Sequence, residues 1–370
     1  MSEISPDPLQ VIAVEAPVFS GDDAVRIAAE HYGLAVEARE LVSERDRNFQ
    51  LRTADGREFV LKIANSLEDP LVTDFQIQAL RHLEARNPDV ATPRVVSTPD
   101  GRLSFALASE GREHIVRLVT WVPGVLLAGR PLTTELCRSF GVCAAKLGRA
   151  LEGFEHPGSN PSLIWNMHET ARVREIAPCI SEAGLQSRVI DCLERFEHEV
   201  LPRFSSLRTQ VVHNDLNPEN VLLDPGDASR VSGVIDFGDM TRSPLIVDVA
   251  VAAAYMRSFQ GDPLSRIATF VAAYHAITPL DRDEIDLIYD LIQVRLATTV
   301  SVLHWRIADR GDAADPYLDN SVAVESTAAK FFAILDAIPR EHARRTLRQA
   351  CASADIALAR DDPGERPPMQ

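Results

Sequence analysis

The sequence predicts an α+β protein in two lobes, a β-rich amino-terminal lobe followed by a mainly helical carboxyl-terminal lobe. Short runs of alternating or β-branched apolar residues, separated by turn residues, fill the chain as far as residue 120. Beyond residue 124 apolar residues recur every three or four positions over long segments, which indicates helices. Pro123-Gly124 interrupts both patterns and marks the predicted boundary. We therefore expect lobes over residues 20–123 and 124–357, with flexible termini over residues 1–19 and 358–370.

Composition places the chain among ordinary globular proteins. Of its 370 residues, 45% are hydrophobic and 25% are charged. The net charge of −16 argues against a nucleic-acid or an anionic-membrane partner. The first residues carry no basic segment followed by an apolar one, and the longest apolar run is too short to span a membrane. Five scattered cysteines without C-x-x-C spacing are typical of reduced thiols. We expect a soluble, cytoplasmic protein, and the sequence does not indicate its oligomeric state.

The amino-terminal lobe begins with a helix over residues 24–31, which Ser20 or Asp22 caps and Gly33 ends. Strands over residues 48–53 and 58–64 are joined by Asp55-Gly56, a strong hairpin signal. The remaining predicted elements of this lobe are a strand over residues 35–41, a helix over 68–86, and strands over 94–97, 103–107 and 114–120.

The carboxyl-terminal lobe combines long helices with three short strands. The strands are expected over residues 210–212, 221–223 and 231–235, and an apolar helix begins near Pro244. The other helices are expected over residues 133–152, 165–176, 185–204, 264–275, 281–306, 320–337 and 340–357.

The three short strands carry the most informative motif. Asp215 follows the first strand, Asn220 lies five residues later, and Asp236 follows the third strand. An acid, an amide and a second acid, each where a strand ends or begins, suit the task of holding metal-bound phosphates beside a hydroxyl group. Asp215 would accept or orient the hydroxyl proton, while Asn220 and Asp236 would hold Mg²⁺ on the phosphates of ATP. Solvated turn residues in a β-meander are the alternative, but turn chemistry does not require this spacing.

Four phrases of the sequence, HNDLNPENVLL, GVIDFGDM, FVLKIAN and RLVTWVPG, carry a family resemblance. They resemble the kinase-like phosphotransferases of the aminoglycoside phosphotransferase and choline kinase type. Within that group the chain is most similar to hydroxylysine kinases and to the kinase-like domain fused to some class III aminotransferases. The resemblance covers roughly residues 21–350. It implies a two-lobed protein-kinase-like fold that binds ATP and Mg²⁺ in its cleft and phosphorylates a small-molecule hydroxyl group.

Lys62 lies among β-branched strand residues, where a half-exposed edge lysine is one interpretation. With a kinase-like site downstream, we expect Lys62 to hold the α- and β-phosphates. Kinases pair this lysine with a glutamate of the following helix, and the predicted helix over residues 68–86 has no glutamate at that distance. Gln76 is the candidate partner through a hydrogen bond, with a solvated helix face as the alternative.

The expected nucleotide-contacting segments depart in part from the protein-kinase pattern. Residues 43–49 stand where a glycine-rich loop would lie, yet they contain no glycine. Ser43 and Asn48 are the candidates there for phosphate contact. The segment Thr120, Trp121 and Val122 is expected to bond the adenine edge through its backbone, with a core aromatic as the alternative for the tryptophan. The arginines at positions 45, 47 and 117 would contact phosphates or lie on the surface.

Two further residues are expected to support the motif. His213 would brace the loop through hydrogen bonds, and Asp248, among apolar neighbours in the helix after Pro244, would bond the backbone of the same loop. Only residues 239–243 separate Asp236-Phe237-Gly238 from that helix, so there is no room for a long activation segment. This shortness favours a small-molecule acceptor over a protein.

The acceptor itself is left open. The resemblance implies an amino alcohol or a hydroxylated amino acid, and an acidic pocket in the carboxyl-terminal lobe would suit its cationic group. Trp165 and His168 lie on the segment that lines the substrate side in similar proteins, although core and surface positions are the alternatives. An aminoglycoside, choline or homoserine is a second possibility for the acceptor. A nucleotide-binding regulatory protein without turnover is the alternative of another class, because fold alone does not determine function.

Overall fold

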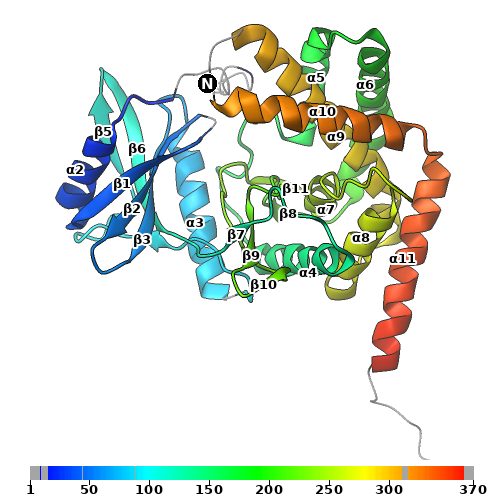
Figure 1. The fold of residues 1–370 in the computed structure, drawn as a ribbon, viewed down its shortest axis with the longest axis horizontal. Coiled ribbons are helices and arrows are strands. Elements are labelled where there is room, and N and C mark those ends of the chain that lie inside the picture. The colour runs from blue at the N-terminus through cyan, green and yellow to red at the C-terminus, as the bar shows by residue number, and fades with distance from the viewer. Residues whose placement is uncertain (1–8, 10–15, 44, 87, 311–315, 362–370) are drawn as a thin grey trace, which may run out of the picture.

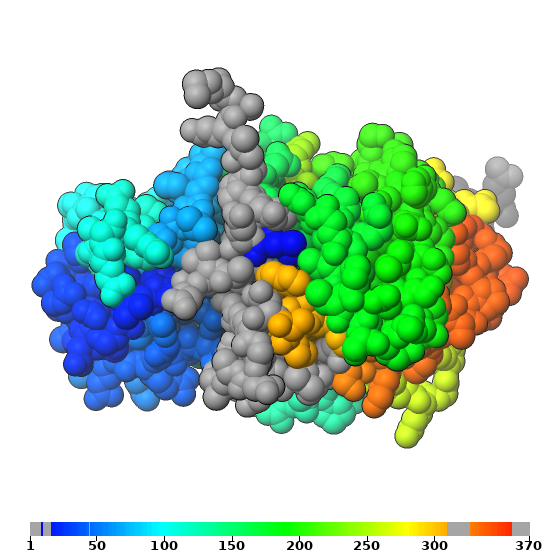
Figure 2. Space-filling model, turned by 90° about the horizontal axis from the view of Figure 1, so that it is seen from above, coloured from blue at the N-terminus to red at the C-terminus, as the bar shows by residue number. Residues whose placement is uncertain are grey.

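The computed structural model describes residues 9, 16–43, 45–86, 88–310 and 316–361. It has the predicted two-part α+β architecture, with a β-rich N-lobe beside a helical C-lobe (Figure 1). Seen from above, the blue to cyan residues of the N-lobe lie at one end of the molecule, and the green and orange residues of the C-lobe at the other (Figure 2). No helix in the described ranges has both the length and the apolar character that a membrane span requires.

The N-lobe is an antiparallel sheet in the order β1-β2-β3-β6-β4, with β5 paired to β6. Its strands are β1 (Val36–Leu41), β2 (Arg47–Thr53), β3 (Glu58–Ile63), β4 (Val95–Val96), β5 (Phe105–Ser109) and β6 (Arg112–Thr120). The β3 strand lies at the centre, so the backbone on both sides of Lys62 is fixed by its neighbours. The sheet therefore presents the predicted phosphate-binding lysine from a rigid element.

Two helices flank this sheet. The first, α2 (Gly21–Tyr32), has Ser20 as its N-cap in a capping box with Asp23, and Gly33 ends it at φ 65°. Its buried face packs with Phe49, among other residues of the sheet, in a separate N-lobe core. The second, α3 (Pro70–Arg86), lies on the side toward the C-lobe (Figure 1). Its buried residues belong to the larger core that the two lobes share.

The C-lobe consists of helices around two small antiparallel sheets. One sheet has the order β10-β9-β7, and the other pairs β11 with β8. Its strands are β7 (Val125–Leu126), β8 (Thr209–Val212), β9 (Val221–Asp224), β10 (Asp227–Val234) and β11 (Thr241–Pro244). The α-helices are α4 (Thr134–Leu151), α5 (Thr170–Ile176), α6 (Ala183–Arg195), α7 (Ile246–Ala253), α8 (Ser265–Ile277), α9 (Arg282–Arg310), α10 (Pro316–Asp336) and α11 (Arg340–Asp361). The predicted lobe boundary at Pro123-Gly124 falls between β6 and β7.

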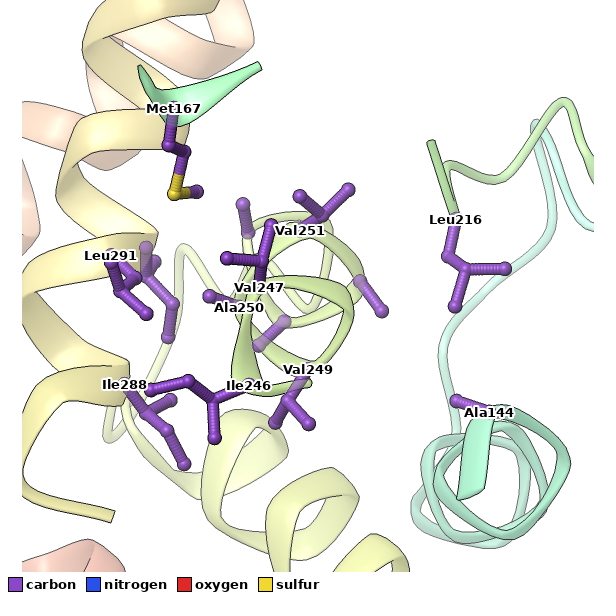
Figure 3. Packing of buried hydrophobic residues seen from close by; sticks show 14 of the residues in the cluster. Ala144, Met167, Leu216, Ile246, Val247, Val249, Ala250, Val251, Ile288 and Leu291 are labelled. Atoms are coloured by element: carbon purple, nitrogen blue, oxygen red, sulfur yellow. The ribbon is translucent and has the colours of Figure 1, made fainter. Parts of the chain in front are cut away.

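The short helix α7 is the centre of the C-lobe core. All eight of its residues are buried, and its apolar side chains point in every direction around the helix axis (Figure 3). On one side it faces Ile288 and Leu291 of α9 (Figure 3). A helix that is apolar all round must be enclosed, and this enclosure fixes α7 against the end of β8.

Several predicted elements differ from the structure. The two short strands β7 and β11 were not expected, because β7 has only two residues directly after Pro123-Gly124 and β11, Thr241-Arg242-Ser243-Pro244, has no apolar run. The helix expected over residues 165–176 starts with a 3₁₀ turn, Met167–Glu169, before α5. The helix expected over residues 185–204 is α6 followed by a π-helical turn, Phe196–Val200, and a 3₁₀ helix, Leu201–Ser206. Pro202, which cannot donate a helical hydrogen bond, accounts for that last change.

The predicted flexible termini are also partly structured. Phe19 is only 8% exposed and belongs to the N-lobe core, and the carbonyl of Pro17 accepts a hydrogen bond from Arg47. At the other end, residues 358–361 continue α11, while residues 362–370 lie outside the described part of the chain. All five cysteines are free thiols, and four of them are buried, as expected for a reduced protein.

Candidate active site

The loop after β8 is held by a buried carboxylate of α7. The backbone N–H of His213 donates to Asp248 Oδ2 at 2.9 Å, and that of Asn214 donates to Asp248 Oδ1 at 2.6 Å. Burial raises the pKa of Asp248, and these two donors oppose the rise because they favour the ionised form. Asn214 has φ 64°, a left-handed conformation that asparagine tolerates better than most residues. The contact predicted for Asp248 is present, and it shapes the turn that leads into Asp215.

His213 joins this loop to the loop after β10. Its Nε2 lies 3.1 Å from the carbonyl oxygen of Ile235, and its Nδ1 accepts the backbone N–H of Asp215 at 3.3 Å. Burial lowers the pKa of His213, so the ring is neutral, with Nε2 as the donor. The edge of the ring also packs against Phe237. The imidazole thus contacts both loops, whereas the sequence predicts its bracing role only for the loop that carries Asp215.

Asp215 is surrounded by three hydrogen-bond donors. Its Oδ1 accepts from Arg295 Nη2 at 2.7 Å. Its Oδ2 accepts from Asn217 Nδ2 at 2.9 Å and from Asn220 Nδ2 at 2.7 Å. Burial raises the pKa of Asp215 to about 6, although Arg295 opposes the rise. A carboxylate with this pKa is mostly ionised at neutral pH and is a better proton acceptor than an ordinary aspartate.

Asp236 and Lys62 meet across the two lobes. Lys62 Nζ lies 3.0 Å from Asp236 Oδ1. The lysine of β3 in the N-lobe therefore contacts the segment that follows β10 in the C-lobe. The charge of Lys62 holds the pKa of Asp236 far below its usual range. Asp236 has φ 58° and keeps 51% of its side chain exposed. This carboxylate is therefore ionised and accessible.

The residues predicted to bind Mg²⁺ fit that ion. The amide nitrogen of Asn220 donates to Asp215, so the amide oxygen of Asn220 points away from Asp215. Asp236 offers an ionised, half-exposed carboxylate. Carboxylate and amide oxygens are ligands that Mg²⁺ accepts, and it commonly binds one or two carboxylates together with substrate phosphates.

The predicted hydrogen bond between Gln76 and Lys62 is wrong. Gln76 Nε2 donates to the carbonyl oxygen of Gly238 at 3.1 Å, and its Oε1 accepts from Arg117. The glutamine side chain is buried and faces β6 rather than Lys62. Lys62 takes Asp236 as its partner instead. Gln76 therefore supports the Asp236-Phe237-Gly238 segment directly, without passing through the lysine.

A buried polar network beside this segment was not expected. We call Arg45, Gln76, Arg117, Gly238 and Asp239 the cross-lobe network. Arg45 Nη2 bonds the Gly238 carbonyl at 3.1 Å and Asp239 Oδ1 at 3.0 Å.

Two of the three arginines predicted as phosphate or surface residues are buried, whereas Arg47 is partly exposed. Arg45 and Arg117 are buried, and Arg117 Nη1 also lies 4.0 Å from Glu68. Arg47 forms an ion pair with Glu40, and its Nε donates a hydrogen bond to the carbonyl oxygen of Pro17. Buried guanidinium groups need acceptors, and here Gly238 and Asp239 provide them for Arg45, while Gln76 and Glu68 provide them for Arg117.

The predicted adenine-binding segment uses part of its backbone in the sheet. Thr120 N–H donates to the carbonyl of Arg94 at 2.9 Å, and Trp121 N–H donates to that of Glu58 at 3.0 Å. These two donors are already engaged, so contact with a base would rest on Val122 and on the carbonyl groups. Asn48 lies opposite Lys62 in the β2–β3 register, and Ser43 is half-buried near the start of the β1–β2 connection. The nucleotide-binding roles of all five residues stay predictions.

Sequence reasoning missed Arg295, Asn217 and Asp239. Arg295 is buried in α9 within the run LIQVRLATTV, where its neighbours are apolar. A single cation in such a run is a signal, because a buried charge requires a partner. Trp165 lies under this guanidinium, with the ring centre 4.8 Å from Cζ. His168 packs instead against Phe204.

The fold and this arrangement of an acid, an amide, a second acid and a lysine define a kinase-like phosphotransferase with an alcohol group as acceptor. The model of the phosphotransferase enzyme family (APH) matches residues 37–288, so the chain belongs to that family.

Individual relatives agree with this assignment. The chain is 28% identical over 313 residues to a hydroxylysine kinase of Xenopus laevis, covering 79% of this chain and 84% of the relative. It is 30% identical over 241 residues to a homoserine kinase of Neisseria meningitidis, covering 64% and 72%.

Solved structures share the fold. An amicoumacin kinase in complex with AMP-PNP and Ca²⁺ superposes with a TM-score of 0.65 at 15% identity, covering 87% of this chain and 95% of that one. A microcompartment-associated aminopropanol kinase superposes with a TM-score of 0.61 at 20% identity, covering 91% and 98%.

Proposed function

We propose that this protein uses ATP and Mg²⁺ to phosphorylate the hydroxyl group of a hydroxylated amino acid or an amino alcohol, with a hydroxylysine-like compound as the first candidate. The observation that carries the proposal is the environment of Asp215. Its carboxylate is fixed by three donors, and burial raises its pKa to about 6. The similarity to hydroxylysine kinases over 79% of the chain supports this choice of acceptor.

In this mechanism Asp215 accepts the proton of the acceptor hydroxyl as the oxygen attacks the γ-phosphorus. His213 and Asp248 hold the loop backbone, so the carboxylate meets the hydroxyl without rearrangement. Lys62 contributes positive charge beside Asp236, where the phosphates would lie. Mg²⁺ held by Asn220 and Asp236 would neutralise negative charge on the transferred phosphoryl group. Nucleotide use is supported by the AMP-PNP complex of the amicoumacin kinase.

Homoserine is the second candidate acceptor, supported by the 30% identity to the Neisseria meningitidis enzyme. Both candidates are hydroxylated amino acids. The two differ in the distance between hydroxyl and carboxylate, which only a direct comparison of acceptors can resolve.

The first experiment measures ADP release with ATP and Mg²⁺ across 5-hydroxylysine, ethanolamine, choline, homoserine and aminoglycosides. Turnover on one acceptor is expected, and Asp215→Asn should reduce it by about 10²- to 10⁴-fold, the usual contribution of a general base. Asp283→Asn, at an exposed position early in α9, serves as the matched control. ATP binding without turnover on any acceptor would favour a regulatory nucleotide-binding protein. Failure to bind ATP as well would contradict the proposal.

A further inference from the structure

Arg295 has more hydrogen-bonding capacity than its described surroundings use. Its side chain is 3% exposed, and Nη2 donates to Asp215. Its Nε and Nη1 are shielded from solvent and form no well-aligned hydrogen bond within the described part of the chain, where the Tyr255 side chain is the other polar group that interacts with the guanidinium. Buried donors without acceptors are rare in folded proteins because they lose hydration without compensation. A guanidinium whose Nη2 bonds Asp215 and whose other nitrogens have only Tyr255 nearby therefore keeps donor capacity for an acceptor that is bound during function.

The surroundings keep this guanidinium charged and oriented. Trp165 stacks on its face at 4.8 Å, and Arg257 lies over the ring of the nearby Tyr255 at 5.2 Å. Burial opposes the charge of Arg295, but Tyr255 and Asp215 outweigh it and raise the pKa of the arginine. The C-lobe therefore presents a cationic group, Arg295, directly beside Asp215.

We propose that Arg295 binds the carboxylate of the acceptor, so that the enzyme selects hydroxylated amino acids over the corresponding amino alcohols. The proposal rests on the kinase function proposed above and narrows its substrate class. A planar guanidinium matches a carboxylate in shape and charge. Arg295 Nη2 already contacts the carboxylate of Asp215. If the acceptor's carboxylate bound Nε and Nη1 of Arg295, a hydroxyl group a few bonds away in the same acceptor would lie beside Asp215.

Entry of a carboxylate requires a side-chain movement, because both free nitrogens are covered. Trp165 is the residue stacked on the guanidinium, and it is itself only partly buried. A rotation of this indole would uncover the charge without disturbing α9. The competing explanation is that Arg295 only neutralises Asp215. That role would affect all acceptors equally and would give no preference for a carboxylate.

The test compares each amino acid with its decarboxylated counterpart. Suitable pairs are 5-hydroxylysine with 1,5-diaminopentan-2-ol and homoserine with 3-aminopropan-1-ol. For the wild type we expect kcat/KM to favour the amino acid by on the order of 10- to 100-fold, the effect of one hydrogen-bonded charge pair. In Arg295→Gln the ratio of kcat/KM for the amino acid to kcat/KM for its decarboxylated counterpart should fall to near one. Any change in Asp215 reactivity affects both members of a pair, so it cancels in the ratio.

Calorimetric titration of the same pairs, with ADP and Mg²⁺ present, provides a readout that does not depend on turnover. Tighter binding of the amino acid by the wild type, lost in Arg295→Gln and partly kept in Arg295→Lys, would support the proposal. Arg203→Gln, at an exposed position with a loose ion pair, controls for the loss of an arginine. The lysine variant also keeps the test valid if the glutamine variant does not fold.

The outcomes separate the two proposals. Equal binding of both members of a pair by the wild type, or a preference that survives in Arg295→Gln, would overturn the role of Arg295. Phosphorylation of either compound would then still support the kinase function. Carboxylate-selective binding that needs Arg295, without phosphorylation of any acceptor, would support the role of Arg295 and overturn the kinase function.

Discussion

The pKa of Asp215 results from opposite effects on one carboxyl group. Burial and the neighbouring carboxylates Asp236 and Asp239 favour the protonated form, while Arg295 and the Asn217 amide favour the ionised form. The result is a pKa of about 6 instead of the ordinary value near 4. Removal of any one of these groups therefore changes the pH at which the carboxyl group can accept a proton.

Activity should depend on pH through this group. Because Asp215 accepts a proton only when ionised, we expect kcat/KM to be constant above about pH 7 and to fall tenfold per unit below about pH 6. Asp236 stays ionised in this range, because Lys62 keeps its pKa far lower. A pH–rate profile at saturating ATP measures the inflection. Arg295→Gln should move it to higher pH, since Arg295 lowers the pKa of Asp215, and an unchanged inflection would contradict this account.

At the residue scale, local spacing was enough to single out Asp215, Asn220, Asp236 and Lys62, because each lies in a strand with a recognisable pattern or close to the end of one. Arg295 was out of reach for a different reason. Its partner lies 80 residues away in the sequence, and periodicity does not show which side of a helix faces a given loop. The lone cation in an apolar run indicates that a partner exists without indicating which residue it is.

At the element scale, the C-lobe depends on close contact between α4 and α8. A Cβ atom on Gly141 would lie too close to the carbonyl oxygen of Phe270 and 3.0 Å from the Cβ of Ala273. Two turns later on the same helix, a Cβ on Gly148 would meet Tyr274 Oη at 3.4 Å, an ordinary contact. The two glycines therefore have different roles, although both lie in helical positions.

Gly141→Ala should destabilise the protein, whereas Gly148→Ala should not. Overpacking against a backbone carbonyl costs about 1–3 kcal/mol, while alanine at a compatible helix position contributes roughly 0.5–1 kcal/mol through its helix propensity. Denaturant unfolding of both variants gives the two free energies. Equal effects of the two substitutions would show that α4 and α8 can separate without cost.

Element positions were predictable where a periodic pattern extends over several turns or strand residues, as in α4, α8 and α9. The pattern was insufficient for β7, which has two residues, and for β11, whose four residues include no apolar run. Each exists because a partner strand is available, β9 for the first and β8 for the second. Such pairing depends on chain segments distant in sequence, so no local signal contains it.

At the scale of the whole molecule, the two lobes are joined by charged and polar contacts at the cleft as well as by the chain. Lys62 reaches Asp236, and Arg45 reaches Gly238 and Asp239. All three C-lobe residues lie in the segment after β10, which carries the predicted metal ligand. The position of the N-lobe is thus coupled to the position of Asp236. The sequence predicts the two lobes, but it does not predict the contacts that couple them.

The pair of Arg45 and Asp239 should show a strong energetic coupling. Both side chains are about nine-tenths buried, so loss of one partner leaves an uncompensated charge. We expect Arg45→Met alone to cost about 3–5 kcal/mol of unfolding free energy, and the double variant with Asp239→Asn to cost less than the sum of the single variants. A double-mutant cycle by denaturant unfolding measures the difference.

The exposed pair of Lys146 and Asp89 provides the comparison for this cycle. Its side chains are 36% and 84% exposed, and such pairs contribute at most about 1 kcal/mol. If Arg45 and Asp239 coupled no more strongly than this surface pair, their contact would add little to the shared apolar core and to the other contacts between the lobes, Lys62 with Asp236 and Gln76 with Gly238. A strong coupling together with a raised KM for ATP in Arg45→Met would instead show that the contact positions Asp236 for the nucleotide, since Asp239 lies three residues after it.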